Sequence, residues 1–340
     1  MQTIKRETHQ QPIDNRLMEL LQKPIQEIDL PFLRNAIEYL RLTVDHEISR
    51  AVFKLGSTAI DLAGTGGSGM SKFNNSTAAA FVVAAHGIDV VKFGNRSITG
   101  TSGSLDFLSA LGCSREPKVT DMENVLNSTN LLFLSAPTCY PNLASIRGER
   151  KRIGKPTIFN FIGPLLNPVK PAYRLMGISN SYMHLLINQF IKTDGITKRA
   201  ITVHSSIRSG YPIIEIDEFI PFTSNTATLI EQSIGGDYPA TVKILDVPAT
   251  VQGPSTPDLG ATTSARILNG SESNVKIFLD IISGSDTKSI HFHGLVLNAG
   301  AAFLSTGAVS CLEDGVYTAK KLIANGSAAR KLDQVRRVMS

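Results

Sequence analysis

The 340-residue chain has few cysteines and no long apolar segment. Cys113, Cys139 and Cys311 are odd in number and widely spaced, and no CxxC pair occurs, which argues against a disulfide framework and a structural zinc site. This cysteine usage is typical of a reducing compartment, so we expect a cytoplasmic protein. The longest apolar run, Ala78 to Ala85, is far shorter than the roughly 20 residues that a membrane span needs. No basic segment followed by an apolar one opens the chain, so we expect no secretion signal.

The excess of positive over negative charge is also small. The 34 basic and 29 acidic residues leave a net charge of only +5, and 42% of the residues are hydrophobic. This composition predicts a folded globular chain with enough core for two modest domains or one large one. The mild positive balance is compatible with anionic substrates, whereas a nucleic-acid-binding protein usually has denser basic clusters.

The first part of the chain has a helical pattern. Residues 1–12 are polar and are expected to form a flexible tail. Apolar residues then recur at helical spacing between residues 13 and 56, and Asp29 with Pro31 is a helix start signal. We therefore expect a small helical domain over residues 13–56, joined by a helical segment near residues 143–156.

After residue 56, short β-rich runs alternate with helical ones. The runs with strand character are residues 58–63, 88–93, 131–135, 173–178 and 200–204. Strand–helix alternation predicts an α/β domain with a mostly parallel central sheet over residues 57–340. From Phe292 to Leu332 the pattern is helical again, interrupted at Gly307 and Gly326. His291 and His293 are expected to cap this last helical region and to hold no metal.

Glycine is concentrated where a ligand would bind. Nine of the 27 glycines lie within residues 64–112, and the sequence GTGGSG (64–69) directly follows the first predicted strand. The polar sequence NNST (74–77) then precedes an apolar helix. Unpaired N–H groups in such a turn and at a helix N-terminus favour phosphate. The alternative is that Ser76 only caps the helix.

A second group of polar residues follows the next strand. KFGNRS (92–97) precedes SGS (102–104), which opens another helix. Lys92 offers a positive charge and the glycines allow close approach, so we expect a second anion contact. The alternative for Lys92 and Arg96 is a solvated loop, and Asp106 could be a simple first-turn acid.

Two further features carry charge. Adjacent carboxylates at Asp217 and Glu218 follow a strand-like run, and such a pair can hold Mg²⁺ together with substrate phosphates, although it is more often a solvated loop. The basic run RGERKR (147–152) is most often a solvated helix face. The alternative is a binding function, in which one guanidinium of this run points inward and binds a carboxylate through two hydrogen bonds.

Taken in order, these segments resemble the anthranilate phosphoribosyltransferase family from about residue 55 to the C-terminus. The matching segments are GTGG with FNNST (64–77), KFGNRS (92–97), SGSLDFLSALG (102–112), TIFNFIGPLLNP (157–168), Asp217-Glu218 and LNAGAAFLSTG (297–307). The resemblance implies a small helical domain beside a larger α/β catalytic domain, usually assembled as a homodimer. It also implies Mg²⁺-dependent transfer of the phosphoribosyl group from phosphoribosyl pyrophosphate to the amino group of anthranilate, with release of pyrophosphate, in tryptophan biosynthesis.

The same resemblance assigns roles to individual residues. For phosphoribosyl pyrophosphate they are Gly64, Gly67, Ser68, Lys72, Asn74, Ser76, Thr77, Lys92 and Ser104. For Mg²⁺ they are Ser76, Asp217 and Glu218. For the aromatic acceptor they are Gly64, Phe93, Asn95, Tyr140 and Arg150, with Arg150 on the carboxylate. No catalytic acid or base is assigned, because an aromatic amine is already uncharged at neutral pH and positioning should matter more.

The sequence departs from the family pattern at several of these positions. Ser68 replaces an acid, and Phe93 and Tyr140 stand where histidines are usual, which suggests a changed acceptor or a changed route to it. Lys72 replaces a threonine in the same loop. The interval between His204 and Asp217 is also long, which implies an inserted hairpin.

Other functions stay open. A paralogue of the same chemistry would use a different aromatic amine. A non-catalytic relative would bind nucleic acid, but such relatives lose the phosphate-loop residues that are present here. A nucleoside phosphorylase is disfavoured because GNRS (94–97) and GPLLNP (163–168) match the transferase.

Overall fold

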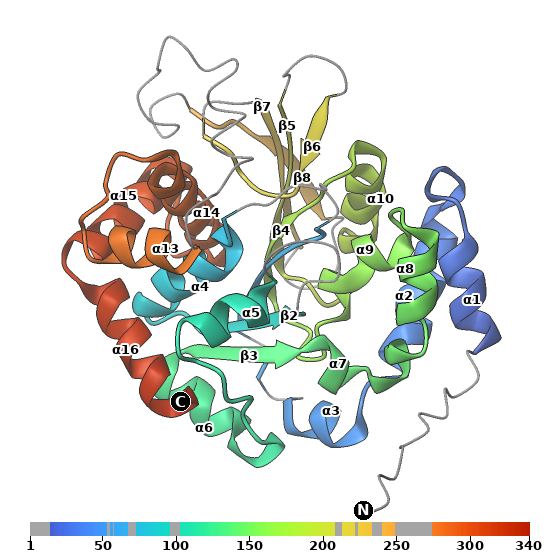
Figure 1. Ribbon diagram of the computed structural model, residues 1–340. Coiled ribbons are helices and arrows are strands. Elements are labelled where there is room, and N and C mark those ends of the chain that lie inside the picture. Colours follow the sequence, from blue (N-terminus) through green and yellow to red (C-terminus); the bar gives the residue numbers. More distant parts are fainter. Residues whose placement is uncertain are drawn as a thin grey trace, which may run out of the picture.

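The structure is a computed structural model. The residues it describes are 14–52, 55–56, 58–66, 73–95, 103–207, 213–221, 224–232, 240–248 and 274–340. The predicted tail and the predicted site residues Gly67, Ser68 and Lys72 lie outside this set. A central sheet runs through the molecule with helices on both of its faces (Figure 1). This is the predicted fold class, and the mostly parallel sheet is confirmed.

The sheet has the strand order β3-β2-β1-β4-β5-β7-β8, with β6 also paired to β5. The pairs from β3 to β5 are parallel, whereas β6, β7 and β8 are antiparallel to their neighbours. The strand bounds are β1 Ile60–Gly64, β2 Val90–Gly94, β3 Leu131–Ser135, β4 Tyr173–Gly177, β5 Arg199–Ile207, β6 Ile214–Ile216, β7 Ser224–Glu231 and β8 Thr241–Leu245. The β5–β6 pair is the hairpin that the long interval before Asp217 predicted.

Successive residues of the parallel strands point to opposite faces, and each face is buried by its own group of helices. One core contains Leu62, Val90 and Leu175, whereas the other contains Val91, Leu132 and Met176. The first is covered by α4 Asn75–Ala85, α5 Ser104–Ala110, α13 Asn274–Ile282, α14 Ile290–Thr306, α15 Leu312–Ala324 and α16 Ser327–Met339. The second is covered by α1 Asn15–Gln22, α2 Leu30–Arg41, α3 His46–Val52, α6 Met122–Thr129, α9 Ile158–Ile162 and α10 Ser181–Ile191. Strands buried on both faces explain the continuous apolar runs in the sequence.

Helix boundaries follow local signals. The Asp29 side chain accepts a hydrogen bond from Phe32 N at 2.8 Å and begins α2, as predicted. Gly307 and Gly326 have φ values of +77° and +75°, which favour glycine, and they separate α14, α15 and α16. The expectation that histidines cap this region is wrong. The N-cap residue of α14 is Ser289, three residues before Phe292. Its hydroxyl accepts a hydrogen bond from Phe292 N at 3.1 Å, so neither histidine occupies the cap position.

Short helices connect the strands on the side of α1 and α2. They are α7 Ala136–Cys139, η3 Pro141–Ala144, α8 Arg147–Ile153 and η4 Gly163–Leu166. There α1 contacts α9 and α2 contacts η4. A separate helical domain over residues 13–56 stays a prediction. Within the described parts of the chain, no helix has the length and apolar character needed to cross a membrane.

Candidate active site

The predicted site residues gather where β1, β2 and β4 end. Gly64 of β1 and Gly177 of β4 are register partners at this edge. Asp217 lies directly over both: a Cβ atom on Gly64 would be 2.3 Å from Asp217 Oδ2, and one on Gly177 would be 1.7 Å from the Asp217 carbonyl oxygen. Two glycines side by side therefore make the space that this acidic residue occupies.

The Asp217-Glu218 segment is anchored by groups from several elements. Gly66 N donates a hydrogen bond to Asp217 Oδ2 at 2.7 Å, and the Ser205 hydroxyl donates to the Glu218 carbonyl at 2.6 Å. Asn298 of α14 accepts from the N–H of the next residue, Phe219, at 3.3 Å and donates to its carbonyl at 3.0 Å. The acidic pair is thus held against the sheet edge and does not form a solvated loop.

The glycine turn after β1 is tied to the end of β4. The Ser179 N–H donates to Thr65 Oγ1 at 3.1 Å, and the Ser179 hydroxyl donates to the Gly66 carbonyl. Gly66 has a φ of +67°, which a side chain would disfavour. These bonds hold Thr65 and Gly66 against Ser179, the second residue after β4.

Lys92 crosses from β2 to the start of α4. Its ammonium group donates to the Leu62 carbonyl and to Ser76 Oγ, the latter at 3.1 Å. The side chain is buried, and burial lowers the pKa of Lys92 from 10.5 to about 8, although Asp61 and Asp217 oppose this shift. Ser76 is inside α4, whose N-cap is Asn74, so the alternative that Ser76 only caps the helix is excluded.

The end of β2 meets the start of α5. A Cβ atom on Gly94 would lie 3.1 Å from Ser104 Cβ, so this glycine lets the predicted substrate residue Ser104 approach the strand. Leu105 N donates to the Asn95 carbonyl at 3.4 Å, and Asp106 accepts from Gly103 N at 3.0 Å as a first-turn acid. The structure therefore brings Asn95 and Ser104 together beside the strand that carries Lys92.

Three of the residues assigned to the acceptor pack against aromatic rings. Arg150 of α8 lies over the Phe159 ring of α9, 5.9 Å from its centroid, and burial lowers the pKa of its guanidinium. Phe93 and Tyr140 are buried and pack edge to face, with their ring centroids 5.9 Å apart. The Tyr140 hydroxyl donates to the Leu166 carbonyl at 2.6 Å. Their contact with an acceptor stays a prediction.

The donor atoms of this site fit Mg²⁺. Two carboxylates and the Ser76 hydroxyl supply oxygen, and Mg²⁺ typically takes one or two carboxylates together with water and substrate phosphates. Among the described residues, no group of three or more His, Cys, Asp or Glu side chains could hold a metal ion.

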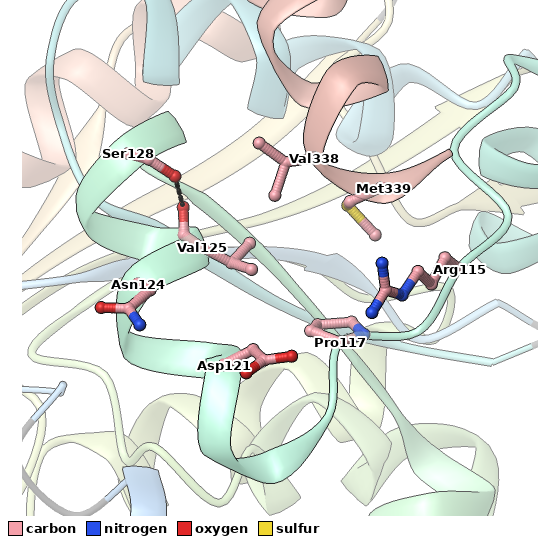
Figure 2. Close-up of a pocket in the computed structure, with 8 residues that line it drawn as sticks. All are labelled: Arg115, Pro117, Asp121, Asn124, Val125, Ser128, Val338 and Met339. Carbon is pink, nitrogen blue, oxygen red and sulfur yellow. Dashed lines mark hydrogen bonds between the residues drawn. The ribbon is translucent and has the colours of Figure 1, made fainter.

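The part of the chain that the structure describes contains a small cavity beside the acidic pair and a larger one elsewhere. One of about 20 Å³ adjoins Glu218, and its wall includes Asn75, whose buried Oδ1 has no hydrogen-bond partner among the described residues. The other, of about 220 Å³, lies between α6 and the end of α16, far from the predicted site in the sequence and lined by different residues (Figure 2). Its lining residues are Arg115, Pro117, Asp121, Asn124, Val125, Ser128, Val338 and Met339.

Comparisons with known proteins agree with this arrangement. A family model described as "Glycosyl transferase family, a/b domain" matches residues 56–329. An anthranilate phosphoribosyltransferase of Pseudoalteromonas translucida (strain TAC 125) is 31% identical over 93% of this chain and 86% of the relative. One from Staphylococcus aureus (strain JH9) is 34% identical over 82% of this chain and 78% of the relative. The chain belongs to the anthranilate phosphoribosyltransferase family. It is therefore a pentosyltransferase of the glycosyltransferase class.

Solved anthranilate phosphoribosyltransferases share the fold. The enzyme of Thermus thermophilus has a TM-score of 0.67 at 20% identity, over 93% of this chain and 86% of that one. The Saccharomyces cerevisiae enzyme, solved in complex with PRPP (phosphoribosyl pyrophosphate) and Mg, has a TM-score of 0.65 at 19% identity, over 92% of this chain and 80% of that one. The same yeast enzyme was also solved with 4-fluoroanthranilate.

Some residues that build the site were not predicted from the sequence. Gly177, Ser205 and Asn298 were not assigned a role, yet each contacts the acidic segment or the residue after it. Asn298 lies within the family segment LNAGAAFLSTG, so its position could have been noticed there. Gly177 ends a strand, where a glycine ordinarily suggests only a turn.

Proposed function

We propose that this protein transfers the phosphoribosyl group of phosphoribosyl pyrophosphate to the amino group of anthranilate in an Mg²⁺-dependent reaction that releases pyrophosphate, as a step of tryptophan biosynthesis. The observation that carries the proposal is the placement of Asp217 over Gly64 and Gly177, beside the buried Lys92 and Ser76. The names of the relatives support it, as do the yeast structures with PRPP, Mg and a fluorinated anthranilate. The proposal includes a cytoplasmic homodimer, which the family resemblance implies.

The basic and the acidic residues of the site have different roles. Lys92 and the N–H groups of the glycine turn bind phosphate oxygens, and Asp217, Glu218 and Ser76 hold the cation. The chemistry that Mg²⁺ supplies when bound is neutralisation of negative charge on the departing pyrophosphate. As the bond from ribose C1 to the pyrophosphate oxygen lengthens, C1 becomes cation-like and the amine attacks from the opposite side. The anthranilate nitrogen is uncharged, so no side chain has to remove a proton before attack, and the proton that the nitrogen loses after the C1–N bond forms passes to water or to the released pyrophosphate.

Arg150 of α8 selects the acceptor by its carboxylate. Arg150 places a guanidinium over the aromatic ring of Phe159, which suits a planar molecule that carries a carboxylate. A carboxylate ortho to the amine would fix the direction of the attacking nitrogen, and holding the reactants in this geometry lowers the barrier. Anthranilate has both groups in that relationship.

The proposal is tested by product analysis. The protein is incubated with phosphoribosyl pyrophosphate, Mg²⁺ and one of three amines: anthranilate, 4-aminobenzoate or aniline. Mass spectrometry should detect the N-phosphoribosyl product mainly with anthranilate, because 4-aminobenzoate moves the carboxylate and aniline lacks it. Product from another aromatic amine and none from anthranilate would overturn the assigned acceptor and would identify a paralogue of the same chemistry. Absence of product with every amine, together with salt-sensitive DNA binding, would overturn the enzyme assignment.

A further inference from the structure

Three consecutive backbone carbonyls in η4 are each bound by a side chain from a different element. Arg174 Nη1 donates to the Pro164 carbonyl at 3.1 Å, and Arg41 Nη2 donates to the Leu165 carbonyl, also at 3.1 Å. The Tyr140 hydroxyl donates to the Leu166 carbonyl at 2.6 Å. We call the donors Arg41, Tyr140 and Arg174 the carbonyl clamp. They come from α2, from the residue after α7 and from β4, so the clamp joins three separate parts of the fold.

The clamp is continued by the next residue of the chain. Asn167 Nδ2 donates to Asp61 Oδ2 at 2.9 Å and to the Val91 carbonyl at 2.8 Å. Because Arg174 is on β4, Asp61 on β1 and Val91 on β2, both ends of the segment 164–167 are fixed to the sheet that carries the proposed phosphate site. The two residues between them are fixed to α2 and to the residue after α7. Buried backbone carbonyls need partners, and here side chains supply them because a short 3₁₀ helix ends at this point.

The clamp uses charge that is costly to bury. Arg174 is 2% exposed and Tyr140 is 1% exposed. Burial and then the nearby Arg174 lower the pKa of Arg41, so the two guanidinium groups repel each other. Burying two like charges is unfavourable unless each is hydrogen-bonded. The placement of both guanidinium groups beside this loop therefore makes an unfavourable electrostatic contribution to the stability of the fold.

The clamped segment leads directly to the acceptor side of the site. Helix α9 immediately precedes η4, and its Phe159 ring lies beneath the Arg150 guanidinium. On the other side, the Tyr140 ring packs against Phe93 at the end of β2. Tyr140 therefore contacts the loop through its hydroxyl and the β2 end through its ring, without facing outward itself.

We propose that the carbonyl clamp, which includes Tyr140, positions Phe159 and hence Arg150 for the acceptor carboxylate. Tyr140 then acts as a positioning residue and does not contact the acceptor. The inference rests on the proposed function only in naming an aromatic carboxylate as the ligand of Arg150. The clamp itself is defined by hydrogen bonds within the chain.

The test compares two substitutions that each remove one tyrosine hydroxyl from a backbone carbonyl. Tyr140→Phe removes the bond to Leu166, and the control Tyr182→Phe, at a more exposed tyrosine, removes the 2.6 Å bond to the Ile28 carbonyl. Tyr140→Phe should raise the KM for anthranilate about tenfold while the Kd for phosphoribosyl pyrophosphate stays within about twofold. Tyr182→Phe should change neither value. A second clamp variant, Arg41→Gln, should act in the same direction as Tyr140→Phe.

Hydrogen–deuterium exchange separates the clamp from the reaction. Amides of residues 158–167 should exchange faster in Tyr140→Phe than in the wild type or in Tyr182→Phe. This readout needs no substrate, so it tests the clamp even if the wild type fails to use anthranilate, a result that would contradict only the proposed function. Unchanged exchange in this segment would overturn the clamp. Equal losses of acceptor and phosphoribosyl pyrophosphate binding would overturn its specific role toward Arg150.

Discussion

Gly177 lies so close to Asp217 that a Cβ atom on the glycine would be 1.7 Å from the aspartate carbonyl oxygen. Contact with backbone atoms leaves little room for adjustment, since a backbone segment cannot rotate away as the end of a side chain can. The partner of Gly177 across the parallel ladder, Gly64, approaches the same aspartate. The position of the acidic pair therefore depends on two glycines from distant parts of the chain.

Gly177→Ala should displace the Asp217-Glu218 segment from the sheet edge. We expect Mg²⁺-dependent affinity for phosphoribosyl pyrophosphate to fall by about tenfold or more, measured by isothermal titration calorimetry with and without Mg²⁺. Gly148→Ala is the control, because a Cβ atom there meets no atom within 4 Å. Equal affinities in the two variants would show that the proposed cation site does not depend on this contact.

Asn298→Ala should make the Asp217-Glu218 segment more mobile, because it removes the connection between α14 and the residue that follows this pair. The substitution leaves the Phe219 N–H and carbonyl without their buried partner, at a cost of about 1–3 kcal/mol in the free energy of unfolding. Asn188→Ala removes two side-chain hydrogen bonds, to Thr202 and Thr228, and is the control for general destabilisation. Only Asn298→Ala should weaken Mg²⁺-dependent binding of phosphoribosyl pyrophosphate. If both asparagine variants weaken it equally, Asn298 has no special relationship with the acidic pair.

Lys92 should give the protein a distinctive alkaline pH dependence. Its pKa is lowered to about 8 in the folded chain from 10.5, so between these values the unfolded chain holds a proton that the folded chain has released. The free energy of unfolding therefore rises as the pH rises from about 8 to 10.5, and this gain in stability is lost when the pH falls back to about 8. Urea unfolding at pH 7.5 to 10.5 should show this rise in the wild type relative to Lys92→Met. Parallel pH profiles for the two proteins would refute the assignment.

The same titration should affect the ligand. Above about pH 8 the free protein loses the Lys92 charge, so its affinity for phosphoribosyl pyrophosphate should decline with rising pH. Lys92→Met should bind more weakly at pH 7 and show less of this decline. The measurement is the Kd at fixed Mg²⁺ concentration across the pH series.

Arg150→Gln should impair acceptor use selectively. Loss of a partly desolvated guanidinium opposite a carboxylate is expected to lower kcat/KM for anthranilate by about 30-fold or more, while affinity for phosphoribosyl pyrophosphate is unchanged. Arg152→Gln on the same helix is the control, because that side chain is 72% exposed and pairs with Glu149. Comparable losses in the two variants would mean that general charge on α8, and not Arg150, attracts the acceptor.

Much of the fold could be predicted because its signals are local. The apolar run 131–135 forms β3 with the expected bounds, since strands buried on both faces need continuous hydrophobic residues. Gly307 and Gly326 were predicted to interrupt the last helices because a positive φ favours glycine at that position. The antiparallel strands β7 and β8 were not predicted. The sequence SNTATLIE of β7 carries several polar residues, and β8 is largely exposed.

The chemistry of the site was partly visible in the sequence, whereas its supports were not. Asp217 follows a strand, Lys92 lies near the end of β2 and Ser76 lies in the first turn of α4, so their positions relative to a sheet edge could be expected. Asn298 is 79 residues from Phe219, and nothing in residue spacing reports that contact. Tyr140 was assigned to the acceptor channel from family resemblance, but only the structure shows its hydroxyl on the Leu166 carbonyl.

The most direct test of the proposed function is release of pyrophosphate from phosphoribosyl pyrophosphate, measured with and without anthranilate and with and without Mg²⁺. Asp217→Asn is the accompanying variant, because an amide oxygen can still accept from Gly66 N while the carboxylate charge is removed. The proposal predicts rapid release only when both anthranilate and Mg²⁺ are present, and loss of that release in a folded Asp217→Asn protein. Tight binding of phosphoribosyl pyrophosphate without anthranilate-dependent release, or wild-type release by Asp217→Asn, would contradict it.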